Sequence, residues 1–313
     1  MAALPESKNI WSYVNTTGVA LTIPYLVYRV LKSIYVNRVY GNLVGKVVVI
    51  TGASSGLGEA LAHEFYMHGC QVVLCARRRQ ELDRVRQDLL KLPMDSPVLH
   101  PIIEPLDLSD LKSLPQHAAN ILAITGHVDI LINNGGLSNR GSVLNTVLDV
   151  DMNIMNVNYF GTVCFTKAFL PKMIKRKQGH IVNVSSVQGL IAIPARSSYS
   201  ASKHALQGFS DSLRAEVSQH NVMVTVVSPG YIKTNLSMNA LTPSGEKHMQ
   251  MDKNTEKGYD ASYVAHEVLK SVTMRRPELV IAPVYVKVAI FLRKYVPSVY
   301  FFIMGRRALK EDS

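Results

Sequence analysis

Residues 47–62, VVVITGASSGLGEALA, decide the fold of this 313-residue chain. They combine an apolar β-branched run, a glycine-rich turn and the start of a predicted helix. Gly52, Gly56 and Gly58 let the backbone turn tightly and approach a pyrophosphate, whose charge a helix N-terminus stabilises. The spacing is G-x3-G-x-G instead of G-x-G-x-x-G, and no Lys-Ser or Lys-Thr follows, which excludes a Walker phosphate loop. The stretch therefore predicts a nucleotide-binding strand, turn and helix.

Similar apolar runs recur along the chain and alternate with predicted helices. The strand-like runs are residues 46–51, 71–76, 128–133, 180–185 and 222–228, with weaker candidates at 98–108 and 278–283. The predicted helices include residues 58–68, 80–92 and 200–219. Because the main runs are almost continuously hydrophobic, they are typical of strands buried on both faces. The alternation predicts right-handed βαβ crossovers and a doubly wound parallel α/β sheet, the Rossmann fold.

The length and pattern predict a single large domain, residues 45–282, with an addition at each end. Residues 231–260 interrupt the alternation with a polar, irregular stretch. Because this stretch follows the carboxyl end of a strand, where open α/β sheets bind ligands, we predict that it is a substrate lid. Residues 283–313 form an apolar and basic extension. Its composition fits core packing, subunit packing and membrane contact equally well.

The N-terminal segment, residues 1–44, predicts membrane association. Residues 10–28 carry no charge, and Arg29, Lys32 and Arg38 follow them. Their length approaches the roughly 20 residues of a spanning helix, although several polar residues, a glycine and a proline weaken the pattern. A cleaved signal peptide fits less well, because only Lys8 precedes the run as a basic residue. We expect an anchor that spans or lies on the membrane, with an amphipathic helix packed on the domain as the alternative.

Composition excludes some classes of partner. The net charge is +11, the pI is about 9.5 and the mean hydropathy is +0.10. The basic residues are spread along the chain without an aromatic and basic recognition motif, so no nucleic-acid partner is predicted. A membrane or an anionic cofactor accounts for the charge. Three cysteines without a CxxC pair are expected to be reduced core residues, and no metal site is predicted.

The second strand-like run ends in CARRR, residues 75–79. Enzymes that use NAD place an acidic residue near this point, where it holds the ribose 2′-hydroxyl. Arg77 can instead pair with a 2′-phosphate, so the sequence favours NADP(H) over NAD(H). The alternative is that residues 77–79 merely cap a helix surface. Asp107 ends the third strand and is expected either to accept from the adenine amino group or to cap the next helix.

The stretch SSYSASKHA, residues 197–205, places Tyr199 and Lys203 on one face of a predicted helix. Hydride transfer to a carbonyl requires a proton, and a nearby ammonium lowers the pKa of about 10 of a free phenol. Ser186 ends a strand-like run and is expected to present its hydroxyl to the substrate oxygen, whereas Ser185 faces away. The alternatives are ordinary packing for Tyr199 and a turn or cap for Ser186.

Six motifs in this chain resemble the short-chain dehydrogenase/reductase family, in order and over residues 45–280. They are TG-x3-G-x-G at 51–58, NNGG at 133–136, NYFG at 158–161, SS at 185–186, Y-x3-K at 199–203 and PGYIKT at 229–234. The resemblance implies the catalytic set Tyr199, Lys203, Ser186 and Asn158, with Ser186 also binding substrate. It implies cofactor contacts from Gly52, Ser54, Ser55, Gly56, Leu57, Gly58, Arg77, Asp107, Asn134, Tyr199, Lys203, Pro229, Gly230 and Thr234.

The resemblance also implies individual roles. Lys203 would bind the nicotinamide ribose, and Asn158 would hold a water that links Lys203 to solvent. Pro229 and Gly230 would shape the wall near the nicotinamide, and Thr234 would bond its carboxamide. NNGG at 133–136 departs from the commoner NNAG, and Gly136 is expected to loosen the backbone without loss of cofactor contact.

The expected function is NADPH-dependent interconversion of a carbonyl and an alcohol on a lipophilic substrate. One branch of the family has similar NNGG and PGYIKTNLS stretches. It implies 1-acyl- or alkyl-dihydroxyacetone phosphate as a candidate substrate, while steroids and retinoids stay open. It also implies the membrane of the endoplasmic reticulum or peroxisome, and a homodimer is a further candidate assembly. A catalytically idle NADP-binding partner or sensor protein is the alternative. An epimerase or dehydratase would need a larger C-terminal domain than about 30 residues.

Overall fold

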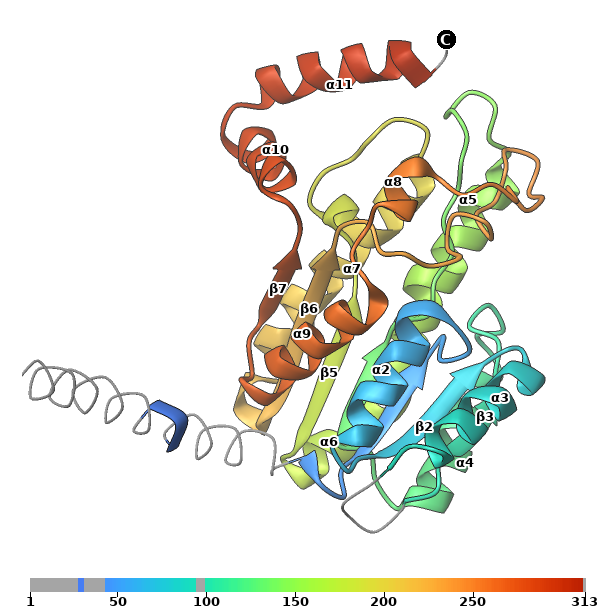
Figure 1. The fold of residues 1–313 in the computed structure, drawn as a ribbon, viewed down its shortest axis with the longest axis vertical. Coiled ribbons are helices and arrows are strands. Elements are labelled where there is room, and N and C mark those ends of the chain that lie inside the picture. The colour runs from blue at the N-terminus through green and yellow to red at the C-terminus, as the bar shows by residue number, and fades with distance from the viewer. Residues whose placement is uncertain (1–27, 31–42, 94–98, 312–313) are drawn as a thin grey trace, which may run out of the picture. The chain divides into compact units, whose positions relative to one another are not determined.

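A seven-stranded parallel sheet of order β3-β2-β1-β4-β5-β6-β7 forms the centre of the computed structural model (Figure 1). The structure describes residues 28–30, 43–93 and 99–311. The strands are β1 Val47–Thr51, β2 Gln71–Ala76, β3 Ile102–Pro105, β4 Ile130–Asn133, β5 Gly179–Val184, β6 Val222–Pro229 and β7 Glu278–Ile281. The predicted doubly wound α/β fold is therefore confirmed.

Helices cover both faces of the sheet. The α-helices that the structure describes from residue 43 onward are α2 Gly56–Met67, α3 Arg79–Leu90, α4 Leu114–Thr125, α5 Leu148–Met155, α6 Thr162–Arg176, α7 Ser197–Glu216, α8 Lys253–Glu256, α9 Ala261–Thr273, α10 Val284–Tyr295 and α11 Pro297–Glu311, of which α10 and α11 lie beyond the end of the sheet. On one face α2 packs against α9, and on the other α4 packs against α6 and α5 against α7. The apolar side chains of β1, β4 and β5 are buried between these layers.

The two weak strand candidates lie at the two edges of the sheet. Among the strands that the structure describes, β3 pairs only with β2, and β7 pairs only with β6. An edge strand is less completely buried than a central one, so its sequence needs a less continuous apolar run. This difference explains why residues 98–108 and 278–283 gave the weaker patterns.

Helices α2 and α7 both begin earlier than predicted. α2 starts at Gly56 instead of residue 58, and α7 starts at Ser197 instead of residue 200. The earlier start of α7 places Tyr199 and Lys203 in its first two turns. Glycine and serine are weak helix formers, so the sequence pattern predicts that both helices begin later than they do.

A π-helix connects α5 and α6 without a break. This segment, η2, covers Asn156–Gly161 and contains Asn158. Such π-turns are rare and occur often at functional sites. Here it brings Asn158 into contact with the segment that follows β4.

The terminal extensions differ in what the structure describes. Most of the predicted anchor, residues 1–44, lies outside the described residues. No helix in the described ranges combines the length and the apolar character that crossing a bilayer requires. The C-terminal extension forms the helices α10 and α11 (Figure 1). These helices expose aromatic and aliphatic side chains, namely Val284, Tyr285, Val288, Phe291, Tyr295, Val296, Val299, Phe301, Phe302, Ile303 and Leu309.

Candidate functional site

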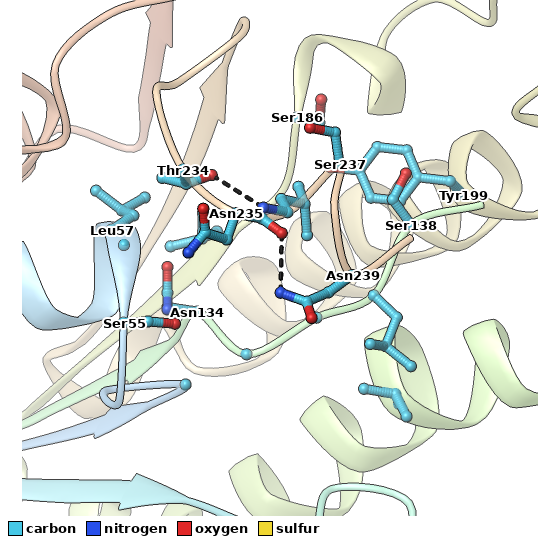
Figure 2. A pocket seen from close by; sticks show the side chains of 18 of the residues that line it. Ser55, Leu57, Asn134, Ser138, Ser186, Tyr199, Thr234, Asn235, Ser237 and Asn239 are labelled. Carbon is cyan, nitrogen blue, oxygen red and sulfur yellow. Dashed lines mark hydrogen bonds between the residues drawn. The ribbon is translucent and has the colours of Figure 1, made fainter. Parts of the chain in front are cut away.

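A cavity of about 540 Å³ lies at the carboxyl ends of the central strands. Its wall includes the glycine-rich turn, the ends of β2, β4, β5 and β6, and the irregular segment 231–260. Figure 2 shows Ser55, Leu57 and Asn134 on one side of the pocket, and Ser138, Ser186 and Tyr199 on the other. Of the predicted site residues, all except Gly58 and Asn158 line this cavity.

The glycine-rich turn has no room for side chains at its key positions. Gly52 and Gly56 have φ angles of +68° and +59°, in the left-handed region that favours glycine. A Cβ atom at Gly58 would lie 2.1 Å from the carbonyl oxygen of Gly52. Gly58 therefore lies beneath the turn and allows α2 to pack against it, instead of lining the cavity.

The start of α2 faces the cavity with polar groups available for an anion. Ser55 is the N-cap residue of α2, yet its side chain makes no capping hydrogen bond. Ser54, Ser55, Gly56 and Leu57 all line the cavity. Free backbone N–H groups at a helix N-terminus attract phosphate groups. The turn therefore fits the pyrophosphate of a dinucleotide.

Two arginines lie where the sequence predicts contact with a ribose phosphate. Arg77 and Arg78 follow β2 and line the cavity. Nη1 of Arg77 lies 3.8 Å from Oδ2 of Asp107, and both side chains are exposed. Oδ1 of Asp107 accepts from the backbone N and the hydroxyl of Ser109, so Asp107 caps a local turn and not helix α4.

Tyr199 lies in the first turn of α7 and lines the cavity with only 7% of its surface exposed. Burial raises the pKa of Tyr199 above its ordinary value of 10.0. The neighbouring Ser186 hydroxyl and the guanidinium groups of Arg196 and Arg140 act in the opposite direction and lower the pKa. A buried phenol among these groups is suited to exchanging a proton with a ligand in the cavity.

Lys203 lies one turn after Tyr199 and is 4% exposed. Its Nζ atom donates to the carbonyl oxygen of Val184 at 2.9 Å and lies 5.7 Å from the centre of the Tyr199 ring. Burial lowers the pKa of Lys203 to about 8. An ammonium held at this place has two further protons to donate to an acceptor in the cavity.

Ser186 and Ser185 point in different directions, as strand alternation predicts. Oγ of Ser185 donates to the carbonyl of Lys203 at 3.2 Å, toward α7. Oγ of Ser186 accepts from the backbone N of Gln188 at 3.1 Å and donates weakly to the carbonyl of Pro229 at 3.4 Å. Ser186 therefore caps a short 3-10 helix, the alternative that the sequence left open, while it also lines the cavity.

Asn158 lies behind the cavity wall and is almost completely buried. Its Nδ2 donates to the carbonyl of Leu137 and to the hydroxyl of Ser202, both at 2.9 Å. Its Oδ1 accepts from the N–H of Leu137 at 2.7 Å. Both amide hydrogens are thus used inside the protein, and Oδ1 alone keeps a free lone pair. The side chain fixes the segment after β4, and the predicted water contact stays a prediction.

The NNGG segment packs directly against the glycine-rich turn. Nδ2 of Asn134 donates to the carbonyl of Thr51 at 3.0 Å. The glycine that stands at the alanine position of NNAG is Gly135 and not Gly136, and a Cβ atom there would lie 2.6 Å from Cδ1 of Leu108. This glycine therefore makes room for Leu108, and the looser backbone stays a prediction. Among the later residues, Thr234 contacts the same turn, because a Cβ atom at Gly56 would lie 3.0 Å from its Cγ2.

Sequence reasoning missed a group of polar residues beside Tyr199. Oδ1 of Asn139 accepts from the backbone N of Tyr199 at 3.2 Å. Arg140 and Arg196 line the cavity and form ion pairs with Asp252 at 2.5 and 2.9 Å. These residues come from three separate segments, so no local spacing could connect them. Within the described ranges, no group of three His, Cys, Asp or Glu residues is arranged to hold a metal ion.

Comparisons with known proteins agree with this geometry. A family model described as short chain dehydrogenase matches residues 46–244. The "Dehydrogenase/reductase SDR family protein 7-like" of Anopheles gambiae is 52% identical over 97% of this chain and 96% of its own length. The "Dehydrogenase/reductase SDR family member 7B" of Xenopus tropicalis is 48% identical over 92% of each chain.

Solved structures show the same architecture. A short-chain dehydrogenase from Streptomyces avermitilis superposes with a TM-score of 0.70 at 28% identity, covering 85% of this chain and 97% of its own. A short-chain dehydrogenase/reductase from Burkholderia phymatum, in complex with NAD, superposes with a TM-score of 0.72 at 24% identity, covering 82% of this chain and 95% of its own. At that identity the second likeness concerns the fold alone.

Proposed function

The chain belongs to the short-chain dehydrogenase/reductase family, and from this premise we propose that it interconverts a carbonyl and an alcohol on a lipophilic substrate with NADP(H). One observation carries the proposal. Tyr199 and Lys203 are buried together on one face of α7, at one end of a cavity whose other end is the glycine-rich turn. A cavity so arranged brings a dinucleotide and a proton donor to the same substrate atom.

The dinucleotide, when bound, supplies or accepts the hydride. The protein's own part is to move a proton and to orient the carbonyl. In the direction of reduction, the Tyr199 hydroxyl gives its proton to the oxygen of the substrate, which Ser186 orients. Lys203 stabilises the phenolate that remains, because its ammonium lies one helical turn away. Asn158 holds the strand end that shapes this part of the cavity.

NADP(H) is the proposed cofactor because of the charge at the end of β2. Arg77 and Arg78 both line the cavity there, and Asp107 is the only carboxylate among the lining residues. A 2′-phosphate would accept a charge-assisted hydrogen bond from Arg77, which would replace the weak 3.8 Å contact between Arg77 and Asp107.

Arg77→Asp is expected to raise the NADPH Michaelis constant by about 10- to 100-fold and to change the NADH constant much less, since a charged hydrogen bond contributes about 1.5–3 kcal/mol. Steady-state kinetics with both cofactors measures this. Arg79→Ala is the matched control, because Arg79 pairs with Asp83 and does not line the cavity. A wild-type preference for NADH would refute the cofactor assignment.

A lipophilic substrate is proposed because apolar side chains line the cavity beside Tyr199. They include Leu137, Val187, Ile232, Leu236 and Leu241, of which the last three belong to the predicted lid. The test is NADPH oxidation, followed at 340 nm, by the full-length protein in vesicles with ketosteroids, retinal and acyl-dihydroxyacetone phosphate. Tight NADPH binding without oxidation of NADPH by any of them would favour the idle NADP-binding protein.

We also propose that α10 and α11 lie on an anionic membrane. Between residues 279 and 310 the chain has no acidic residue and six basic ones. Cζ of Arg293 lies 5.0 Å from the ring centre of Phe301, and Cζ of Arg306 lies 4.7 Å from the ring centre of Phe302. Exposed aromatic rings with adjacent cations suit the boundary between lipid headgroups and acyl chains. This charge favours lipid over a second copy of the chain, whose own surface here is equally basic. The endoplasmic reticulum or peroxisome stays the proposed location.

The protein lacking residues 1–38 keeps the compact unit that begins at residue 43. It is expected to float with phosphatidylserine vesicles and to dissociate as salt rises. Phe301→Glu with Phe302→Glu is expected to reduce this binding at least tenfold, whereas Tyr263→Glu on the remote helix α9 leaves it unchanged. If the truncated protein stays in solution, residues 1–38 are the sole anchor. Dimerisation that the double substitution abolishes, with no binding to vesicles, would assign the surface to a second copy.

A further inference from the structure

Arg140, Arg196 and Asp252 form a partly buried charged cluster in the cavity wall, beside Tyr199. The side chains are 12%, 11% and 18% exposed. Both guanidinium groups contact the single carboxylate of Asp252, so the cluster carries a net charge of +1. An unbalanced charge away from water is unfavourable unless a further group of opposite sign approaches it.

The two arginines use their donors differently. Nε and Nη2 of Arg140 donate to Asp252 at 3.1 and 2.5 Å, and Nη1 donates to Ser138 and to the carbonyl of Asn139 at 2.8 and 2.6 Å. Within the described part of the chain, Arg196 donates one hydrogen bond, from Nη2 to Asp252 at 2.9 Å. A guanidinium has five N–H donors, so Arg196 keeps most of them for a ligand.

Tyr231 supplies a second donor at the same place. Its ring lies under the guanidinium of Arg196, 5.6 Å from ring centre to Cζ. Its hydroxyl is buried and has no hydrogen-bond partner among the described residues. An unpaired buried hydroxyl is unfavourable, because it has lost its hydrogen bonds to water. A ligand oxygen that accepts from Tyr231 would remove this penalty.

The charge of the whole cavity wall favours a ligand that is anionic at both ends. Six cationic side chains line it: Arg77, Arg78, Arg140, Arg196, Lys203 and Lys247. Asp107 is the one lining carboxylate, and it lies beside Arg77 at the end proposed for the cofactor. The positive charge around Arg196 therefore has no counterpart among the lining residues.

We propose that Arg196 and Tyr231 bind an anionic group of the substrate, and that Arg140 and Asp252 hold Arg196 in position. The inference rests on the proposed function and names its substrate class, a lipophilic carbonyl compound that carries a phosphate or a carboxylate. The planar guanidinium matches either group with paired hydrogen bonds. Leu137, Ile232 and Leu241 line the same cavity and contact the apolar part.

The place of Arg196 in the chain supports this role. It lies three residues before Tyr199 and is the N-cap residue of α7, so the chain holds its guanidinium close to the phenol of Tyr199. Burial, and then the charge of Arg140, lower the pKa of Arg196. A bound anion would offset both effects. The lid is tied to the site as well, since Asp252 and Tyr231 belong to segment 231–260.

The test compares three long-chain ketones that differ only at the far end: a phosphate monoester, a carboxylate and the methyl ester of that carboxylate. With full-length protein in vesicles and NADPH, kcat/KM is expected to be at least about tenfold higher for the better anionic ketone than for the ester. Arg196→Gln should lower kcat/KM of the anionic ketones about 10- to 100-fold more than that of the ester, mainly through KM, because Arg196 affects the ester only through the pKa of Tyr199. Preference between phosphate and carboxylate identifies the anion.

Arg196→Lys keeps the charge without the planar fork and should give an intermediate loss for the anionic ketones. If circular dichroism shows that Arg196→Gln does not fold, the same kinetic comparison is made with Arg196→Lys. Lys112→Gln, at an exposed position, is the matched control for charge. Equal losses for all three ketones, or no preference in the wild type, would overturn the inference. If the wild type reduces none of them, the proposed function fails, and calorimetric titration of the phosphate ketone and the ester still decides the anion site.

Discussion

Tyr199→Phe is expected to lower kcat by about 10²- to 10⁴-fold, the usual contribution of a positioned general acid or base. The phenylalanine ring keeps the packing of a side chain that is 7% exposed, so the fold and the cavity should be preserved. The NADPH dissociation constant, measured by calorimetric titration, is expected to stay within about threefold of the wild type. Turnover with the best substrate of the carbonyl screen measures the loss.

Tyr263→Phe is the matched control for this substitution. Tyr263 is 49% exposed on α9, where its ring stacks on Tyr259. Removing its hydroxyl should leave kcat and the free energy of unfolding unchanged. If Tyr199→Phe retained wild-type turnover, the proton would have to come from another group, and the assignment of Tyr199 would be wrong.

Gly58→Ala is expected to destabilise the domain by about 3 kcal/mol and to raise the NADPH dissociation constant at least about 100-fold. The added Cβ atom would lie 2.1 Å from the carbonyl oxygen of Gly52 and 2.7 Å from Nδ2 of Asn134. The carbonyl oxygen of Gly52 belongs to the backbone and cannot rotate away, so the glycine-rich turn must open. An open turn loses one or two of the N–H contacts that would hold a pyrophosphate.

Gly208→Ala provides the contrast for this prediction. Gly208 lies in α7, and a Cβ atom there would meet nothing within 4 Å. Alanine at this exposed helical position should stabilise the protein by roughly 0.5–1 kcal/mol and leave NADPH binding unchanged. Urea unfolding and a cofactor titration on both variants measure the two effects. Equal stability of the two variants would show that the turn tolerates a side chain at Gly58.

The central strands and the glycine-rich turn were predictable because local composition determines them. Each central strand is buried on both faces, so its apolar run is almost unbroken, and β2 has the predicted bounds. Tyr199 and Lys203 were equally accessible to prediction, since four positions within one helix fix their common face. The family resemblance then supplied Ser186 and Asn158, which the spacing of residues alone would not have distinguished from ordinary polar residues.

The sequence could not reveal the cluster of Arg140, Arg196 and Asp252. The contact between Arg140 and Asp252 joins residues 112 positions apart, and the contact between Arg196 and Asp252 joins residues 56 apart. Such pairs form only when the loop after β4, the start of α7 and segment 231–260 meet above the sheet. The position of Gly58 beneath the turn likewise depends on the close approach of α2 to the turn. The motif by itself predicts that Gly58 contacts the cofactor.

The π-helix η2 allows two halves of one continuous helix, α5 and α6, to pack against different neighbours. An α-helix advances about 100° per residue, so one additional residue in a turn rotates everything after it by that angle about the axis. α5 before the turn meets α7, whereas α6 after it meets α4. Without this additional rotation about the helix axis, either α5 or α6 would turn its apolar face toward water. The same inserted turn carries Asn158, so the change of helical register that fits α5 and α6 to their neighbours also brings this amide behind the cavity wall, where it binds the backbone of Leu137.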